Sequence, residues 1–258
     1  MTIEYDPFAG PVLFGTAPTT EHQREIWTAS QLGDDASLAY NESVRLELDG
    51  KLNVAAFKSA FSEVLLRHEI LNASISGDGL TFCLHAPEEG RLAVRDLCGL
   101  DVSAQSSELL ALYLEEVTLP FDLTKASLYR AHLLRLSETR TVFVFTAHHI
   151  ICDGWSLAVI VKDLGKFYTR AVLGFEEKSP VTLTYSDYAR GEATRDPKAQ
   201  AEDEQHFLRS LNGELPILEL PLSKARPSRR TFHSRREDHT LESSLIGRIR
   251  QVGIQRKA

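Results

Sequence analysis

The sequence predicts an α/β fold in which helices pack against a mixed β-sheet. Strand-like and helix-like patterns alternate along the chain, and two pairs of strands are spaced as hairpins. One stretch, from Thr141 to Ala171, has the pattern of a strand, a polar turn and a helix in succession. With 258 residues, of which 43% are apolar, the chain is long enough to bury a sizeable core.

The stretch from Thr141 to Ala171 is central to this prediction. Residues 142–145 are Val-Phe-Val-Phe without a polar interruption, which is typical of a strand buried on both faces. The strand pattern ends at His148 and His149, and Asp153-Gly154 follows. The next apolar residues recur at helical spacing: Leu157, Ile160, Val161, Leu164, Phe167, Tyr168 and Ala171. A polar turn at the end of a buried strand is where α/β proteins place their chemistry.

The other expected elements lie on both sides of this stretch. In chain order they are an irregular lead-in over residues 1–18, a helix opened by a capping box of Thr20 and Gln23, a strand over 44–48, a helix capped by Asn53 and ending at Arg67, a hairpin of 70–75 with 80–84, a short strand at Val94, a helix over 103–117, a hairpin of 128–136 with 140–146, and helices over 199–211 and 241–252.

Residues 216–236 differ in composition from the rest of the chain. They contain three prolines and a set of basic residues: Lys224, Arg226, Arg229, Arg230, Arg235 and Arg236. Two interpretations are open, a solvated connector and an electrostatic landing surface for an acidic partner or a phosphate.

The two histidines are expected to have different roles, because neighbouring residues of a strand point to opposite faces. One is expected to face the site as a general base or substrate positioner, since imidazole has the unperturbed pKa nearest neutrality. The alternatives are a metal site that includes Asp153, a thiol pair of Cys152 with His149, and two core histidines. Opposed faces argue against one shared metal ion, and nothing near Cys152 is set to lower a thiol pKa.

Charge and cysteine usage exclude several classes of protein. A net charge of −7 and a pI near 5.7 give no reason to expect a nucleic-acid partner. The three cysteines (Cys83, Cys98 and Cys152) are scattered without CxxC spacing, which favours a reducing cytoplasm over a disulfide framework or zinc site. We expect a cytoplasmic protein without a membrane span, since the sequence has neither a signal-like start nor a sufficiently long apolar run.

The segment HHIICDGWS resembles the HHxxxDG signature of the condensation domains of nonribosomal peptide synthetases. A wider set of acyltransferases related to chloramphenicol acetyltransferase shares this signature. TTEHQREIWTASQLGDDASLAYNES is similar to the family's opening motif, most closely in domains that follow a polyketide module in a hybrid assembly line. RHEILNASI resembles the motif RHExLRT, with Asn72 where a second arginine is usual. PFDLTKASLYRAHLLRL and LTYSDYARGE resemble two further motifs, in the family's order.

The resemblance runs from about Pro18 to the C-terminus and implies one lobe of a two-lobed, chloramphenicol acetyltransferase-like fold. Residues 19–215 are expected to form the N-terminal lobe, and residues 216–258 the basic connector and first helix towards the second lobe. A half-domain of this kind lacks one wall of the substrate channel. It is therefore expected to be inactive alone and to self-associate through its exposed apolar surface.

The implied function is amide-bond formation between a carrier-bound acyl or peptidyl thioester and the amine of a carrier-bound aminoacyl thioester. The expected partners are upstream and downstream carrier domains with their phosphopantetheine arms, an adenylation domain and the second lobe. No directly bound cofactor and no metal are expected. The alternatives are an acyl-CoA-dependent acyltransferase, an epimerisation domain of the same fold, and a non-catalytic platform that recruits carrier proteins.

The resemblance also implies roles for individual residues. His149 matches the catalytic histidine, and His148 is its supporting neighbour. Asp153 with Arg67 resembles a buried ion pair that holds the loop in shape. Gly154 is expected to permit a backbone geometry or close approach that a Cβ would hinder, with its amide facing the developing oxyanion.

Overall fold

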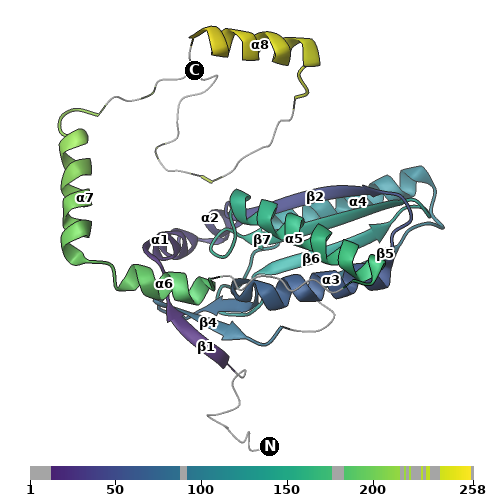
Figure 1. Cartoon of the computed structure of the whole chain (residues 1–258), viewed down its shortest axis with the longest axis horizontal. Coiled ribbons are helices and arrows are strands. Elements are labelled where there is room, and N and C mark those ends of the chain that lie inside the picture. The colour runs from purple at the N-terminus through teal and green to yellow at the C-terminus, as the bar shows by residue number, and fades with distance from the viewer. Residues whose placement is uncertain are drawn as a thin grey trace, which may run out of the picture.

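The computed structural model describes residues 13–87, 92–175, 183–215, 218, 221, 228, 231–232 and 239–256 (Figure 1). Its strands are β1 Leu13–Pro18, β2 Asn41–Asp49, β3 Ala73–Ile75, β4 Thr81–His85, β5 Leu92–Asp96, β6 Tyr129–Arg135 and β7 Arg140–His148. Its helices are α1 Glu21–Ser30, α2 Asp34–Leu38, α3 Val54–Arg67, the short 3₁₀ helix η1 Glu69–Asn72, α4 Val102–Thr118, α5 Gly154–Leu173, α6 Tyr185–Ala193, α7 Pro197–Ser210 and α8 Ser243–Arg256.

A four-stranded sheet forms the centre of the fold, with strand order β2-β7-β6-β5. The β5–β6 pair is parallel, whereas β2–β7 and β6–β7 are antiparallel, so the sheet is mixed as predicted. Strand β7 lies between two neighbours, and every residue from Thr141 to His148 is buried. The apolar run at 142–145 therefore predicted the burial of this strand correctly.

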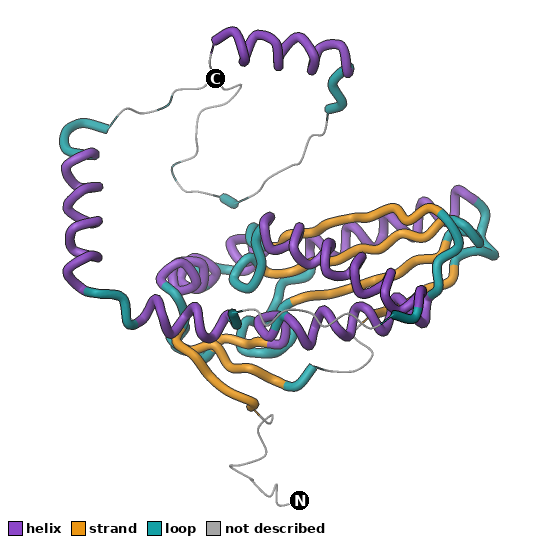
Figure 2. The backbone as a smooth tube through the Cα atoms, viewed as in Figure 1, coloured by secondary structure: helices purple, strands orange, loops and turns teal. Residues whose placement is uncertain are grey.

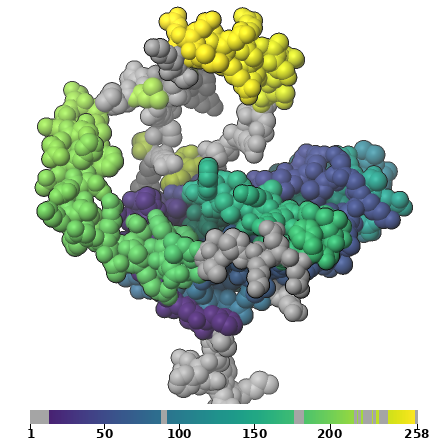
Figure 3. All heavy atoms as spheres, viewed as in Figure 1, coloured from purple at the N-terminus to yellow at the C-terminus, as the bar shows by residue number. Residues whose placement is uncertain are grey.

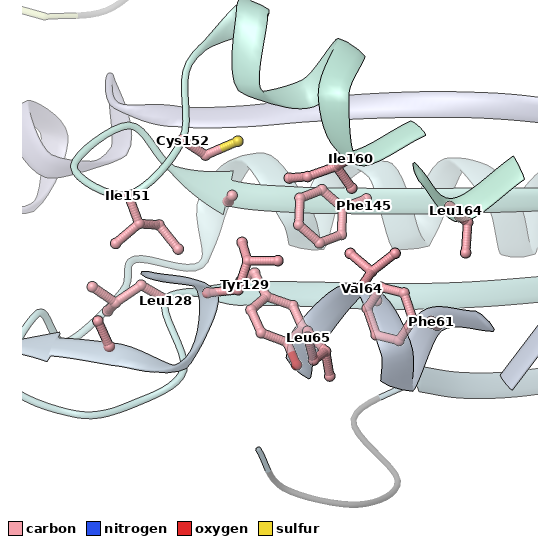
Figure 4. Packing of buried hydrophobic residues seen from close by; sticks show 14 of the residues in the cluster. Phe61, Val64, Leu65, Leu128, Tyr129, Phe145, Ile151, Cys152, Ile160 and Leu164 are labelled. Carbon is pink, nitrogen blue, oxygen red and sulfur yellow. The ribbon is translucent and has the colours of Figure 1, made fainter. Parts of the chain in front are cut away.

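Helices cover both faces of this sheet. Successive side chains of β7 point in opposite directions and are apolar, so each face of the strand is buried against helices. Phe143 and Phe145 belong to the larger core, together with residues of α3 and α5, such as Phe61 and Leu164 (Figure 4). Val144 faces the opposite side and packs in a smaller core with apolar residues of α4 and β6. Figure 1 shows α3 and α5 running along the sheet. One strand thus connects two hydrophobic layers.

A second sheet, of order β1-β4-β3, lies beside the first (Figure 2). It corrects the prediction of an irregular lead-in over residues 1–18, since Leu13–Pro18 is a strand that pairs antiparallel with β4. This edge strand is defined by main-chain hydrogen bonds to β4. Such hydrogen bonds require no hydrophobic repeat in the sequence, so the strand could not be predicted from the residue pattern. The hairpin turns at Gly79 with φ of +76°, where a Cβ would collide with the Trp27 ring.

Most helices begin where the sequence predicts. Thr20 and Gln23 form the expected capping box of α1, and Asn53 caps α3 through the Ala56 N–H. In the predicted hairpin, residues 69–72 are the 3₁₀ helix η1 rather than strand. Neither α7 nor α8 has a buried residue, and in Figure 3 α7 stands away from the packed body. The six basic residues between 224 and 236 lie outside the described residues.

A charged cluster is buried on the α4 side of the sheet. Glu116 is 2% exposed, and its carboxylate accepts a hydrogen bond from Arg130 Nε at 2.9 Å and lies 2.9 Å from His132 Nε2. Burial alone would raise the pKa of Glu116. Hydrogen bonds from His132, Thr146 and Arg130 outweigh burial and lower this pKa to about 2. The cluster therefore fixes the end of α4 to strands β6 and β7 as long as Glu116 is ionised.

We predict that Glu116 makes the free energy of unfolding depend on pH. Its folded-state pKa lies below the ordinary value of 4.5, so its stabilisation is present above that value and is lost as the pH falls towards 2. The amount lost is on the order of 3 kcal/mol. Urea unfolding from about pH 6 to about pH 3 should show about 2 kcal/mol of this loss in the wild-type protein and a flatter profile in Glu116→Gln.

The adjacent Glu115 is exposed, so Glu115→Gln is the matched control and should keep the wild-type profile. Parallel pH profiles for the wild-type protein and Glu116→Gln would contradict the assignment.

Candidate active site

The turn after β7 is held by three segments that are distant in the sequence. The His148 N–H donates to the Leu128 carbonyl at 2.9 Å, and the His149 N–H donates to the Tyr40 carbonyl at 2.7 Å. The side chain of Gln23 in α1 donates to the Ile150 carbonyl at 3.0 Å. Because α1 and the residues directly before β6 and β2 each fix one residue of this segment, its backbone is preorganised.

His148 is completely buried, with an exposed fraction of 0%. Its Nδ1 accepts from the Ile150 N–H at 3.2 Å, and the Phe121 ring meets it edge-on with 6.2 Å between centroids. Burial lowers its pKa to about 4. The charge of His149 adds to this shift, and the backbone of Ser37 opposes it. His148 is therefore a neutral packing residue at physiological pH.

His149 lies on the other side of the turn, with 33% of its side chain exposed. Its Nδ1 is 2.7 Å from Glu42 Oε1, and the Tyr40 ring stacks on it at 6.3 Å. The structure thus gives the two histidines different environments, as their adjacent positions predict. The catalytic role of His149 stays a prediction. Glu42 was missed by the sequence analysis, which began the strand at Val44 and so did not pair residue 42 with the end of β7.

Two of the alternative chemistries find no support at this site. Burial raises the pKa of the Cys152 thiol to about 12, and the nearby charges of Glu42 and Asp153 act in the same direction, so a thiolate is disfavoured. In the part of the chain that the structure describes, no group of three or more His, Cys, Asp or Glu residues could hold a metal ion. Over the same residues, no helix is long and apolar enough to cross a membrane.

The predicted ion pair of Arg67 with Asp153 is wrong in this structure. Arg67 Nε lies 3.0 Å from Asp163 Oδ2, and His68 Nε2 approaches the same oxygen at 2.9 Å. Asp153 instead caps α5, accepting from the Ser156 N–H at 2.7 Å and the Ser156 hydroxyl at 2.6 Å. These hydrogen bonds lower the pKa of Asp153. The end of α3 packs beside the third turn of α5 rather than its start. Arg67 therefore pairs with Asp163 in that turn and not with Asp153 at the start of the helix.

Gly154 differs from the expectation, and the structure gives Asn72 a structural role. Gly154 is the first residue of α5, and a Cβ added there would have no neighbour within 4 Å, so crowding does not explain the glycine. Its N–H remains one of the orphan donors at the helix N-terminus. Asn72, at the position of the usual second arginine, is buried and donates to the Leu65 carbonyl at 2.7 Å. Asn72 therefore satisfies a backbone carbonyl in the last turn of α3.

A cavity of about 770 Å³ lies between the end of α3, the start of α5 and α6. Its walls include Arg67, Asp163, Ile151, Trp155 and Tyr188, but not His149. Arg67 is thus placed beside this cavity, whereas His148, His149, Asp153 and Gly154 share the turn.

The mixed sheet with its packed helices, and the His-His-x-x-x-Asp-Gly turn at the end of β7, define a fold of the chloramphenicol acetyltransferase-like class. The family model of the condensation domain matches residues 14–257, and the chain belongs to that family. It is 34% identical to chondramide synthase cmdD of Chondromyces crocatus over 229 residues, which is 87% of this chain and 6% of the synthase. It is 27% identical to bacitracin synthase 2 of Bacillus licheniformis over 255 residues, which is 96% of this chain and 9% of that synthase.

Solved structures agree with this assignment of the fold. The starter condensation domain of rhizomide synthetase RzmA matches with a TM-score of 0.68 and 24% identity, over 80% of this chain and 51% of that one. The complex of the X-domain and OxyB from teicoplanin biosynthesis matches with a TM-score of 0.66 and 28% identity, over 85% of this chain and 48% of that one. The chain therefore spans about half the length of these solved relatives and a small part of the curated synthetases.

A double-mutant cycle tests the pairing of Arg67. Because Arg67 and Asp163 are both largely buried and in contact, Arg67→Ala and Asp163→Ala together should destabilise the protein by less than the sum of the single changes, with a coupling of about 0.5–3 kcal/mol. Arg67→Ala with Asp153→Ala is the matched control and should be additive within about 0.5 kcal/mol. Coupling to Asp153 and none to Asp163, measured by urea unfolding, would restore the original prediction.

Proposed function

We propose that this chain is the N-terminal lobe of a condensation domain that forms amide bonds in nonribosomal peptide synthesis. The donor is an acyl or peptidyl thioester and the acceptor is the amine of an aminoacyl thioester. Both are carried on phosphopantetheine arms of carrier domains. The observation that carries the proposal is the partly exposed His149 in a fixed HHxxxDG turn, in a chain of the condensation-domain family.

The chemistry of thioesters matches what this site offers. A thioester is already activated towards an amine, so no covalent enzyme intermediate is needed. The main requirement is to hold two tethered reactants together, which contributes up to about 7–11 kcal/mol when the geometry is good. One proton must leave the attacking nitrogen, and a partly exposed imidazole at the end of a buried strand is suited to accept it or to orient the amine.

The described residues divide this work between them. His149 contacts the acceptor amine, while the buried, neutral His148 keeps the turn in place from behind. Asp153 shapes the turn by capping α5. The N–H of Gly154 lies at the positive end of the α5 dipole, where it favours negative charge developing on the thioester oxygen.

The proposed partners follow from the same chemistry. A second lobe, joined to this chain or separate, supplies the other wall of the channel, and the lobe alone self-associates through apolar surface such as Trp155, which is 81% exposed. Upstream and downstream carrier domains deliver the thioesters, and an adenylation domain loads the acceptor. The opening motif favours a polyketide module as the source of the donor. The three free cysteines support a cytoplasmic setting.

We predict that His149→Ala, made in a full-length module, lowers the rate of amide formation by about 10²–10⁴-fold, because the proton acceptor is lost. Aminoacyl loading of the carrier should be unchanged, and intact-protein mass spectrometry follows both steps. The exposed His206 of α7 provides the matched control, and His206→Ala should condense at the wild-type rate.

Wild-type condensation by His149→Ala would exclude the assigned role. The isolated chain should form no amide product, since only one wall holds the reactants, and light scattering of the same sample tests its association. A monomer that condenses loaded carriers by itself would contradict the proposal for the second lobe.

A further inference from the structure

We propose that Glu42 is a positioning residue that holds His149 through Nδ1 and so presents Nε2 to the reacting amine. The inference rests on the proposed function for the identity of that amine. Its geometric part concerns only the two side chains and can be tested without condensation activity.

The sheet register brings the two residues together. Glu42 pairs with Ala147 across the antiparallel β2–β7 ladder, so it lies opposite the residue two positions before His149. Glu42 Oε1 is 2.7 Å from His149 Nδ1. The residues just before it on the chain contribute as well, because the Tyr40 carbonyl accepts the His149 N–H at 2.7 Å and the Tyr40 ring stacks on the imidazole at 20°. One short segment thus restrains both the backbone and the ring of His149.

The two ring nitrogens differ in access. Nδ1 of His149 is shielded from solvent, although a third of the side chain is exposed, so the exposed surface lies on other atoms of the side chain. The contact with Glu42 has the distance of an ion pair but not the alignment of a hydrogen bond. The proposal therefore includes a small rotation of the carboxylate about the last torsion of the glutamate, which is soft.

The carboxylate determines which nitrogen carries the proton. A neutral imidazole has one donor and one acceptor nitrogen, and a carboxylate can only accept from it. Glu42 therefore favours the tautomer with the proton on Nδ1, which leaves Nε2 as the acceptor. The titratable groups around His149 also include the stacked Tyr40, Asp153 at the cap of α5, whose pKa it helps to lower, and the neutral His148 behind it.

The proton balance of the reaction agrees with this arrangement. The amine nitrogen attacks the thioester carbonyl, a C–N bond forms and the C–S bond breaks. The proton of the amine passes to Nε2 and then to the departing thiolate, which leaves as a thiol. While Nε2 holds that proton the imidazole is positively charged, and Glu42 stabilises this charge at Nδ1.

A spectroscopic measurement on the full chain tests the proposal. With ¹⁵N-labelled histidine, long-range ¹H–¹⁵N spectra distinguish the tautomers, and the signals of His149 are assigned by their loss in His149→Gln. We expect the Nδ1–H tautomer in the wild-type protein and a shift to the Nε2–H tautomer in Glu42→Leu. Glu42→Thr, which suits an edge strand, provides the same comparison if the leucine variant does not fold.

Glu47 on the same strand offers the matched control. It is an exposed glutamate that pairs with Arg140 at 3.2 Å at the far end of β2, so Glu47→Leu should leave the tautomer of His149 unchanged. In a full-length module, Glu42→Leu should lower kcat by about 10-fold or more, but less than His149→Ala, with little change in KM. Thermal unfolding should change little, since an ion pair that is about a third exposed is screened by solvent and contributes little stability.

Two outcomes would overturn the proposal: the Nε2–H tautomer in the wild-type protein, or the same tautomer before and after the change at Glu42. Both are independent of the proposed function, which fails instead if His149→Ala condenses normally.

Discussion

The antiparallel pairing of β2 with β7 is the constraint on which the rest of the structure depends. It runs without a break from Asn41 opposite His148 to Asp49 opposite Arg140, and it places β7 inside the sheet, buried on both faces. A strand in that position must be apolar until it leaves the sheet, so polar chemistry becomes possible only at its end. The HHxxxDG turn is located at that end, where α1 and the residues directly before β2 and β6 fix its backbone.

The same constraint separates the two histidines. His148 continues the ladder and is enclosed on the α4 side, where desolvation keeps it neutral, whereas His149 has left the ladder and meets Glu42 and Tyr40. A rigid, neutral residue next to a partly exposed one is a reasonable arrangement for chemistry that needs placement more than activation. Under the proposed function, a second lobe supplies the enclosing wall at His149 that proximity catalysis requires.

Much of the fold and part of the site could be predicted from the sequence, because their signals are local. The apolar run of β7, the caps at Thr20 and Asn53 and the helical spacing after Ser156 each depend on a few adjacent residues. Three features could not be predicted, for the opposite reason. The strand β1 and the role of Glu42 were missed, and the partner predicted for Arg67 was wrong. Each depends on contacts between distant segments: an edge pairing, a strand register, and the position along α5 at which α3 packs. Residue type and spacing carry little information about such contacts.

The central claim is that the turn buries His148 as a neutral residue and leaves His149 available for chemistry. NMR titration of the histidine ring signals tests it most directly, with His148 assigned by their loss in His148→Asn, whose amide oxygen can replace Nδ1 as the acceptor for Ile150. We expect the His148 signals to keep their neutral positions as the pH is lowered and to shift only near pH 4. A titration of His148 near its ordinary value of 6.5 would contradict the claim, because burial of the ring as the structure shows lowers its pKa well below that value.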